Sequence, residues 1–326
     1  MSDLVLVTGS TGFLGSWICR TLLEQGYRVR AMHRESSSLL AIEDLPVERV
    51  IGDILEPQTL TTPMQGVRYV FHAAAQSDYW RNPHCVLQSS IDGTRNVCAA
   101  ALPAGVERLV LTSSISAMGI PEGNELLDES HTFSLDPDDF PYGYAKRGAE
   151  VVALEACARG LDLVITNPSL VLGPGDVNQI SGSMVIEAAR GRTFLWMNGG
   201  VNFIHVEDAA RGHLNALDRG ESGERYILGN ENLTHQEVFT ELARIVNGRP
   251  PWLKLPHALV PLSATIIDAL NRFVQMPLSG AQLRMASKYL FCDTSKARQE
   301  LDFSPEHTFH QAAVETYRWY QEHGYI

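Results

Sequence analysis

The sequence predicts an α/β protein with a doubly wound parallel sheet and a smaller, mostly helical C-terminal part. In the first half of the chain, short β-branched runs alternate with longer helical patterns, which is typical of successive βαβ units. A glycine-rich turn directly follows the first of these runs. The 326 residues, 44% of them hydrophobic, suffice for one large or two modest domains with a buried core.

Apolar runs bounded by turn residues predict six strands, at Leu4–Val7, Tyr27–Met32, Val47–Ile51, Tyr69–Ala73, Arg108–Ser113 and Leu161–Thr166. Helices are expected between them, at Phe13–Gln25 before Gly26, at Pro83–Ala104, and at Tyr142–Arg159 before Gly160.

A stretch rich in proline and glycine, Asn167–Asp176, predicts a loop that joins two domains. The first domain would comprise residues 1–166 and also receive 201–230, and the second would comprise mainly 167–326. In the later chain we expect helices at Ser183–Arg190 and Glu207–Asp218 and strands at Asn202–His205 and Arg225–Leu228. The last third is predicted to be mostly helical, with helix starts at Thr234, Ser279 and Thr294.

Charge and cysteine content exclude several classes of protein. Lys and Arg total 26 against 38 Asp and Glu, a formal charge of −12, which excludes a general nucleic-acid binder. No basic leader or apolar run of roughly 18 residues is present, so we expect a cytoplasmic protein with no membrane partner. The five cysteines are scattered, which favours a reducing compartment without disulfides or zinc.

The segment TGSTGFLG, from Thr8 to Gly15, follows the first strand and opens the first helix. Gly9, Gly12 and Gly15 would allow a tight turn, close approach of the backbone to a pyrophosphate, and close packing of the helix on the sheet. The helix N-terminus would then face the negative charge. This context predicts a dinucleotide-binding Rossmann fold.

The cofactor is predicted to be NADP(H), preferred over NAD(H). About 20 positions after the glycines, an acidic residue would hold the ribose of NAD, whereas an arginine accommodates the 2′-phosphate of NADP. Arg34 stands there, followed by the hydroxyls of Ser36, Ser37 and Ser38. Two alternatives stay open: Glu35 could favour NAD, and Arg34 could be an ordinary surface charge.

Tyr142 and Lys146 lie four residues apart in a predicted helix, and therefore on one face of it. A free tyrosine titrates near 10, and a neighbouring ammonium in a low-dielectric cleft can lower that pKa enough for proton transfer. Tyr144 would face elsewhere.

With these two motifs the chain resembles the extended short-chain dehydrogenase/reductase superfamily, in particular its dihydroflavonol-4-reductase-like and hopanoid-associated epimerase-like branch. The resemblance covers nearly the whole chain. It also includes GDI at Gly52–Ile54, FHAAA at Phe71–Ala75, GTRNV at Gly93–Val97, TSSISAMG at Thr112–Gly119, NPSLVLGPGD at Asn167–Asp176 and NFIHVEDAARGH at Asn202–His213.

The resemblance implies that Ser114 polarises a substrate carbonyl, that Tyr142 donates the proton, and that Lys146 holds the ribose and lowers the pKa of the tyrosine. Ser113 is the rival hydroxyl. Further cofactor contacts are implied at Thr11, Phe13, Leu14, Asp53, Ile54, Ala73, Ala74, Ala75, Thr112, Ser113, Pro168 and Ser169.

Two departures from the superfamily pattern bear on the chemistry. Ser90 stands where an asparagine is usual, which puts a water-bridging or proton-relay role at that position in doubt. Nucleotide-sugar 4,6-dehydratases carry an acidic pair after the catalytic hydroxyl, whereas this chain has Ile115 and Ser116. We therefore do not expect dehydration.

Several other residues have a functional and a structural interpretation. We expect five residues to wall a substrate pocket, with ordinary packing as the alternative for each: Tyr79, Trp80, Met118, Phe140 and Trp196. Metal-binding spacing is lacking around the histidines, so we expect no metal site and structural roles for His72, His205 and His213. Glu207 and Asp208 would place favourable charge at a helix N-terminus.

The sequence thus predicts an NADPH-dependent reductase of a ketone or aldehyde. One alternative is a nucleotide-sugar epimerase with bound NAD, whose diphosphate could be held by Arg190, Arg192, Arg249 or Arg284. Another is a non-catalytic NADP-binding regulatory protein. A homodimer is also expected, through Pro83–Ala104 and Tyr142–Arg159, with Cys98 and Ala153 near a two-fold axis.

Overall fold

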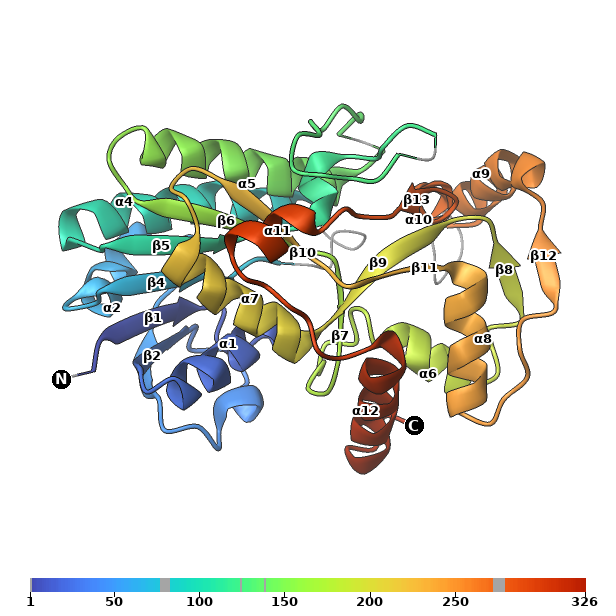
Figure 1. The fold of residues 1–326 in the computed structure, drawn as a ribbon, viewed down its shortest axis with the longest axis horizontal. Coiled ribbons are helices and arrows are strands. Elements are labelled where there is room, and N and C mark those ends of the chain that lie inside the picture. The colour runs from blue at the N-terminus through green and yellow to red at the C-terminus, as the bar shows by residue number, and fades with distance from the viewer. Residues whose placement is uncertain (1, 77–82, 124, 138, 272–278) are drawn as a thin grey trace.

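A parallel sheet of seven strands forms one half of the molecule in the computed structural model, which describes residues 2–76, 83–123, 125–137, 139–271 and 279–326 (Figure 1). The strand order is β10-β6-β5-β4-β1-β2-β3, so the direction of winding reverses between β1 and β4. The strands are β1 (Leu4–Thr8), β2 (Arg28–His33), β3 (Glu48–Ile51), β4 (Tyr69–His72), β5 (Arg108–Thr112), β6 (Leu163–Pro168) and β10 (Arg225–Leu228). The predicted fold class is confirmed.

Helices cover both faces of this sheet, as Figure 1 shows. Val5 and Val7 of β1 pack toward one face, and Leu6 packs toward the other, because successive side chains of a strand alternate. The first face is covered by α1 (Phe13–Glu24), α7 (Val206–Arg219) and α11 (Ser295–Glu300). The second is covered by α2 (Thr61–Met64), α4 (Gly93–Ala104) and α5 (Pro141–Cys157).

The later chain builds a second, smaller sheet around β9 (Gly200–His205). Its neighbours are β7 (Leu170–Leu172), β11 (Glu231–Thr234) and β13 (Tyr289–Leu290), and a separate pair is formed by β8 (Leu195–Met197) and β12 (Leu253–Leu255). The helices here are α6 (Ser183–Ala189), α8 (His235–Ile245), α9 (Val260–Leu270), α10 (Gly280–Ala286) and α12 (Phe309–Glu322). The remaining helical segments are η1 (Leu40–Ile42), η2 (Pro57–Thr59), α3 (Pro83–Leu87), η3 (Gln88–Asp92), η4 (Ile115–Met118) and η5 (His257–Leu259).

The predicted elements of the first half are confirmed, with ends that differ by at most two residues, and the helix expected at Pro83–Ala104 consists of the consecutive segments α3, η3 and α4. One expectation for the later chain is corrected. Asn167–Asp176 is not all loop, because β6 extends to Pro168 and Leu170–Leu172 pairs with β9. The described part of the last third is mostly helical, as predicted, and it also contains three short strands that pair with distant segments and leave little local signal. Thr234 and Ser279 do cap helices, each through a capping box.

Within residues 201–230, α7 and β10 belong to the seven-stranded unit, whereas β9 is the centre of the smaller sheet. The division of the chain at residue 166 into two domains stays a proposal. Cys98 of α4 and Ala153 of α5 are buried in the core of the chain itself, so neither side chain is exposed to a partner. The expected homodimer with these residues near its two-fold axis stays a proposal. Among the described residues, no helix has the length and apolar character needed to cross a bilayer.

Candidate active site

The predicted phosphate-binding turn lies between β1 and α1, at the carboxyl end of a strand beside the middle of the sheet. Gly9 adopts a φ of +69°, and a Cβ added to it would lie 2.7 Å from the Cα of Ala74. A Cβ at Gly15 would lie 2.1 Å from the carbonyl oxygen of Gly9. Glycine is therefore required at both positions, and the turn leaves the N-terminus of α1 without a side-chain cap at Gly12. This is a backbone cradle of the kind that holds a phosphate.

The other residues of the turn support this cradle. Thr11 and Leu14 are half-buried, and Phe13 is packed in the core. The hydroxyl of Ser10 donates to the carbonyl oxygen of Met32 at 2.9 Å, which ties the turn to the end of β2. The loop that follows β2 is thereby held beside the cradle.

Arg34 lies directly after β2, in this loop, and its side chain is exposed together with Glu35, Ser36 and Ser38. None of the ion pairs among the described residues involves Arg34 or Glu35. Both charges therefore stand at the edge of the predicted site, where either could meet the ribose of a dinucleotide.

The ends of β3 and β4 continue the same edge of the sheet. Asp53 and Ile54 follow β3, and the side chain of Asp53 accepts a hydrogen bond from the amide of Leu55 at 2.9 Å. Ala73 and Ala74 are half-buried beside Gly9, and Ala75 is exposed. The carboxyl ends of parallel strands around a reversal of winding are where such sheets bind ligands.

Ser114 and Lys146 are brought to the carboxyl end of β5, the next strand along. Lys146 is 6% exposed, and its ammonium donates to the carbonyl oxygen of Thr112 at 3.1 Å. Ser114 follows two residues later and caps the short helix η4. A Cβ at Gly143 would lie 2.6 Å from the carbonyl oxygen of Ser116, so the first turn of α5, which carries Tyr142, packs directly against η4. Tyr142 and Lys146 lie one helical turn apart.

Tyr144 points away from this site. It is 42% exposed, and its ring lies 6.3 Å from that of Phe133. Tyr142, by contrast, is half-buried.

The structure distinguishes the two serines that follow β5. The Ser113 hydroxyl donates to the carboxylate of Glu150 at 2.7 Å, inside the protein. The Ser114 hydroxyl accepts a hydrogen bond from the amide of Ser116 at 3.2 Å, which leaves its own proton for another acceptor. Ser114 is therefore the better placed of the two to polarise a carbonyl.

Burial governs the titration of the groups around this site. It lowers the pKa of Lys146 to about 8, although the charge of Glu150 acts in the opposite direction. Burial, and then the charge of Lys146, lower the pKa of His72 to about 3. Burial likewise lowers the pKa of His213 to about 4. Both imidazoles are thus neutral near pH 7, and they bond to the hydroxyls of Thr8 and Thr112.

Two residues that the resemblance singles out carry buried hydroxyls with no hydrogen-bond partner within the described part of the chain. One belongs to Ser169, which follows Pro168 at the end of β6, and the other belongs to Ser90. A buried polar group without a partner is costly, so these hydroxyls suit a site that a polar ligand or water completes. The glycine cradle and these two groups fit a nicotinamide dinucleotide.

The residues predicted to wall a substrate pocket are placed differently from one another. Met118 is 1% exposed and packs in an apolar cluster with Ile227 and Cys292, which favours a structural role. Phe140 is buried and stacks on another phenylalanine. Trp196 lies on β8, with an ammonium 4.6 Å above its ring. Tyr79 and Trp80 lie outside the described residues.

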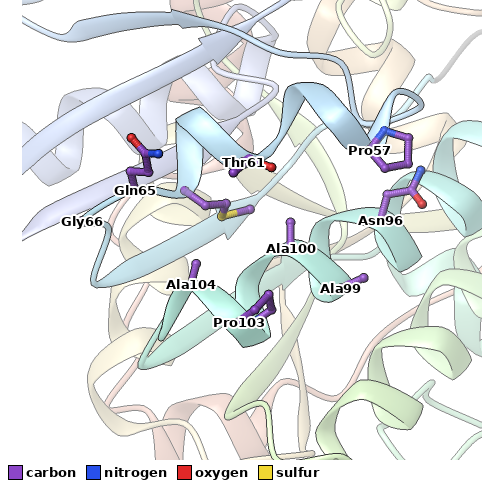
Figure 2. A pocket seen from close by; sticks show the side chains of 10 residues that line it. Pro57, Thr61, Gln65, Gly66, Asn96, Ala99, Ala100, Pro103 and Ala104 are labelled. Atoms are coloured by element: carbon purple, nitrogen blue, oxygen red, sulfur yellow. The ribbon is translucent and has the colours of Figure 1, made fainter.

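A groove of about 570 Å³ runs between α2 and α4 (Figure 2). Its lining contains none of the predicted catalytic or cofactor-binding residues: Pro57, Thr61, Met64, Gln65, Gly66, Asn96, Ala99, Ala100, Pro103 and Ala104. It is therefore separate from the candidate active site.

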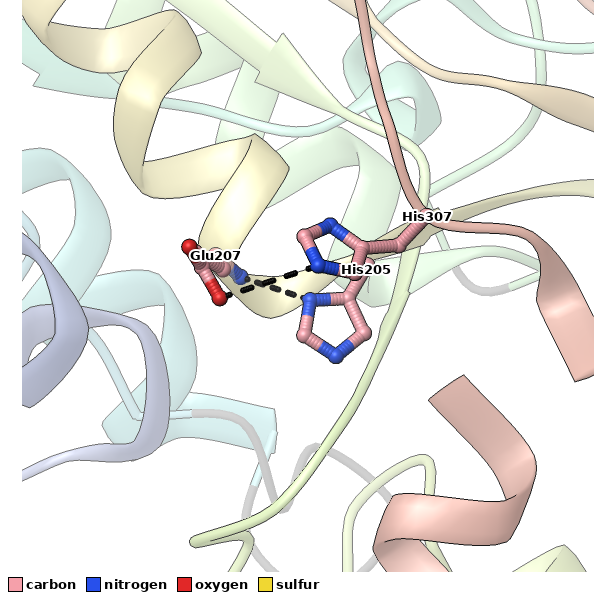
Figure 3. Close-up of side chains that lie close together, drawn as sticks. All are labelled: His205, Glu207 and His307. Carbon is pink, nitrogen blue, oxygen red and sulfur yellow. Dashed lines mark hydrogen bonds and ion pairs between the residues drawn. The ribbon is translucent and has the colours of Figure 1, made fainter. Parts of the chain in front are cut away.

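His205, Glu207 and His307 form a cluster whose potential ligand atoms all lie within 4.8 Å of one another (Figure 3). The ring of His205 is already engaged, because it accepts from the amide of Glu207 at 3.2 Å and bonds to Glu315 of α12 at 3.0 Å. The two imidazole rings stack with centroids 4.3 Å apart, and Nε2 of His307 lies 3.9 Å from the carboxylate of Glu207. Asp208 is buried and accepts from the amide of His307 at 2.9 Å. The cluster thus fastens the segment before α12 to the start of α7.

The sequence did not lead us to three residues whose side chains are buried or half-buried at the site: Glu150, Asn167 and Arg225. Asn167 was part of a recognised motif, but no role was expected for its side chain. Glu150 lies four residues after Lys146, the same spacing as between Tyr142 and Lys146, and that signal was available. Arg225 lies on β10, far along the chain, and nothing local to it pointed to the site.

Comparison with known proteins places the chain in a family. Residues 5–229 match the model of the NAD dependent epimerase/dehydratase family, and the chain belongs to that family. It is an NAD(P)-dependent oxidoreductase of the extended short-chain dehydrogenase/reductase type.

Named relatives support the dihydroflavonol-4-reductase-like branch. A Synechocystis protein named as a candidate dihydroflavonol 4-reductase is 38% identical to this chain, and the match covers 100% of this chain and 97% of that protein. Sterol demethylase protein B of Methylococcus capsulatus is 31% identical over 98% of this chain and 99% of its own length. Cinnamoyl-CoA reductase 2 of Arabidopsis thaliana is 33% identical over 74% of this chain and 77% of its own.

Solved structures share the fold over the whole chain. The crystal structure of gox2253 is 33% identical, with a TM-score of 0.89 and full coverage of both chains. That of PA4631, a nucleoside-diphosphate-sugar epimerase from Pseudomonas aeruginosa, is 26% identical, with a TM-score of 0.85 and full coverage of both chains.

Proposed function

We propose that the protein is an NADPH-dependent reductase of a ketone or aldehyde. The observation that carries this proposal is the buried ammonium of Lys146, bonded at 3.1 Å to the carbonyl oxygen of Thr112. This bond fixes the helical turn that carries Tyr142 beside Ser114, at the same edge of the sheet as the Gly9 cradle. The reductase names among the relatives add support.

Each of these residues has a distinct part in the reaction. A bound nicotinamide supplies the hydride that a carbonyl carbon accepts. Tyr142 gives its phenolic proton to the carbonyl oxygen, and the hydroxyl of Ser114 donates a hydrogen bond to the same oxygen. The ammonium of Lys146 stabilises the tyrosinate that is left, because opposite charges within a few ångströms favour the charged form.

The preference for NADPH rests on Arg34. Its exposed guanidinium stands after β2 with no carboxylate partner among the described residues, and hydroxyls follow it at Ser36, Ser37 and Ser38. A guanidinium forms strong, charge-assisted hydrogen bonds to a phosphate.

A nucleotide-sugar epimerase is the second candidate, because PA4631 carries that name. It would need free cations for a diphosphate. Arg190 and Arg192 both face Glu187, at 3.9 Å and 3.3 Å, and Arg284 faces Asp268 at 3.5 Å. Three of the four candidate arginines are thus paired, and Arg249 alone of the four is in none of the ion pairs among the described residues, which favours the reductase.

A screen of NADPH oxidation over aromatic ketones, aliphatic ketones, β-ketoesters, aldehydes and nucleotide sugars tests the proposal. We expect turnover with at least one carbonyl class, and a cofactor that exchanges during gel filtration. Retained NAD, together with interconversion of a nucleotide sugar and no net NADPH oxidation, would replace the reductase with the epimerase. If the wild-type protein binds the cofactor but turns over none of these substrates, a non-catalytic role would be favoured.

A further inference from the structure

A fully buried carboxylate, that of Glu150, links the segments that carry the catalytic groups. It lies on α5, one turn after Lys146 and two turns after Tyr142. Its Oε1 accepts from the hydroxyl of Ser113 at 2.7 Å and from the amide nitrogen of Asn167 at 2.6 Å. One atom thus joins helix α5 to the residue after β5 and to a residue of β6.

The other oxygen of this carboxylate faces two guanidinium groups. Arg147 of α5 and Arg225 of β10 each lie 3.3 Å from Oε2. Arg225 also donates to the carbonyl oxygens of Glu129 and His131, so it is fixed from both sides. A buried carboxylate needs partners of this kind, because an unpaired charge in the interior is strongly destabilising.

Asn167 extends the link to Ser114. Its side-chain nitrogen donates both to Glu150 and to the backbone carbonyl of Ser114, at 2.9 Å. Glu150 therefore holds the Ser113 hydroxyl inside the protein and, through Asn167, fixes the backbone from which the Ser114 hydroxyl projects.

The charge of Glu150 also acts on Lys146. The Lys146 ammonium donates to the carbonyl oxygen of Thr112, and its charge acts on the ring of His72. Glu150 lies one helical turn further along α5, and its charge acts on Lys146. Of these, the carboxylate supplies the negative charge, and it opposes the effect of burial on the pKa of the lysine. Arg147 and Arg225 add positive charge behind it.

We infer that Glu150 is the positioning residue of this site: its carboxylate holds the Ser113 hydroxyl inside the protein, leaves the Ser114 hydroxyl free, and places a negative charge one helical turn from Lys146. The inference rests on the proposed function, because it assigns Glu150 a role in that reaction. Glu150 acts through Lys146 and the serines, and it touches no substrate.

The direct test is titration of the Lys146 ammonium by NMR in protein labelled at lysine Cε, without cofactor. The chain has only four lysines, Lys146, Lys254, Lys288 and Lys296, so the signals are few, and Lys146→Met assigns the one of interest. In Glu150→Gln the amide oxygen can still accept from Ser113 and Asn167, but the charge is gone. We expect the pKa of Lys146 to fall by roughly one unit. Glu155→Gln removes an exposed charge from the same helix and should leave it unchanged.

Glu150→Asp distinguishes the effect of the negative charge from the effect of side-chain length. It also provides the test if Glu150→Gln does not fold. With its negative charge retained, the aspartate should hold the pKa of Lys146 within about 0.3 units of the wild-type value, whereas the shorter side chain loosens Ser113. A fall as large as that expected for glutamine, or no fall in folded Glu150→Gln, would overturn the inference.

Kinetics provide the second readout. In Glu150→Gln the alkaline limb of kcat/KM for carbonyl reduction should move about one pH unit lower, and in Glu155→Gln it should stay in place. A loss of activity with an unmoved limb and an unmoved lysine pKa would mean that Glu150 is structural only, with the reductase function intact. If the wild-type protein turns over no carbonyl substrate, the proposed function fails, and the NMR titration still decides whether Glu150 controls Lys146.

Discussion

Replacing Lys146 by methionine should make the protein more stable while it removes activity. Burial lowers the pKa of this ammonium from 10.5 to about 8, a shift of roughly 2.5 units. At about 1.4 kcal/mol per unit, the charged lysine costs the folded state about 3 kcal/mol at pH 7. Methionine has a similar shape and no charge, but it loses the bond to Thr112, worth about 1 kcal/mol. We expect the free energy of unfolding to rise by about 2 kcal/mol.

The stability difference between Lys146→Met and the wild-type protein should depend on pH in a definite direction. Below pH 8 the lysine is charged in both the folded and unfolded states, and the whole cost of burying the charge is present. Between about pH 8 and 10.5 the folded state has lost the proton and the unfolded state still holds it, so wild-type stability rises with pH. The advantage of Lys146→Met should therefore be largest at pH 7 and disappear near about pH 10. Above that pH it should reverse slightly, because only the loss of the bond to Thr112 remains.

Urea denaturation of both proteins at pH 7 and pH 10, followed by circular dichroism, measures the difference. Lys288→Met is the matched control, since that lysine is exposed and its loss should change stability by less than about 0.5 kcal/mol. A Lys146→Met variant that is no more stable at pH 7, or whose advantage is the same at both pH values, would refute the reasoning that this ammonium is buried at a cost.

Three further predictions concern activity. Tyr142→Phe should reduce turnover by roughly 10² to 10⁴ with cofactor affinity nearly intact, whereas Tyr144→Phe, at an exposed position, should change it little; steady-state kinetics of both decide which phenol donates the proton. Ser114→Ala should lower kcat by about 10² or more, and Ser113→Ala should lower it by less than tenfold, because the Ser113 hydroxyl is already bonded to Glu150. A larger loss in Ser113→Ala than in Ser114→Ala would exchange the roles of the two serines. Arg34→Ala should weaken NADPH binding by at least about tenfold and leave NADH binding unchanged in fluorescence titrations, and equal losses for both cofactors would contradict the phosphate assignment.

The seven-stranded unit was predictable because its signals are local. Each central strand is a short apolar run with buried neighbours on both faces. In the turn between β1 and α1, glycine is required at Gly15 by a contact with Gly9, six residues earlier in the chain. The Tyr142 and Lys146 pair was likewise set by helical spacing alone. The smaller sheet was not predictable in this way: Leu170–Leu172 is three residues long, lies among prolines and glycines, and becomes a strand only by pairing with β9 about thirty residues later.

The choice between Ser113 and Ser114 shows why part of the site could not be deduced from the sequence. Both serines follow β5, and both have the same chemistry, so spacing cannot rank them. The difference arises from Glu150 on α5, which accepts from Ser113, and from Asn167 of β6, which bonds to Glu150 and to the backbone of Ser114. Glu150 could have been noticed, since it repeats the four-residue step from Tyr142 to Lys146. Its partners belong to other strands, and only the packing of α5 on the sheet brings them together. The hydroxyl that is left to meet a substrate is therefore decided by a carboxylate that never touches one.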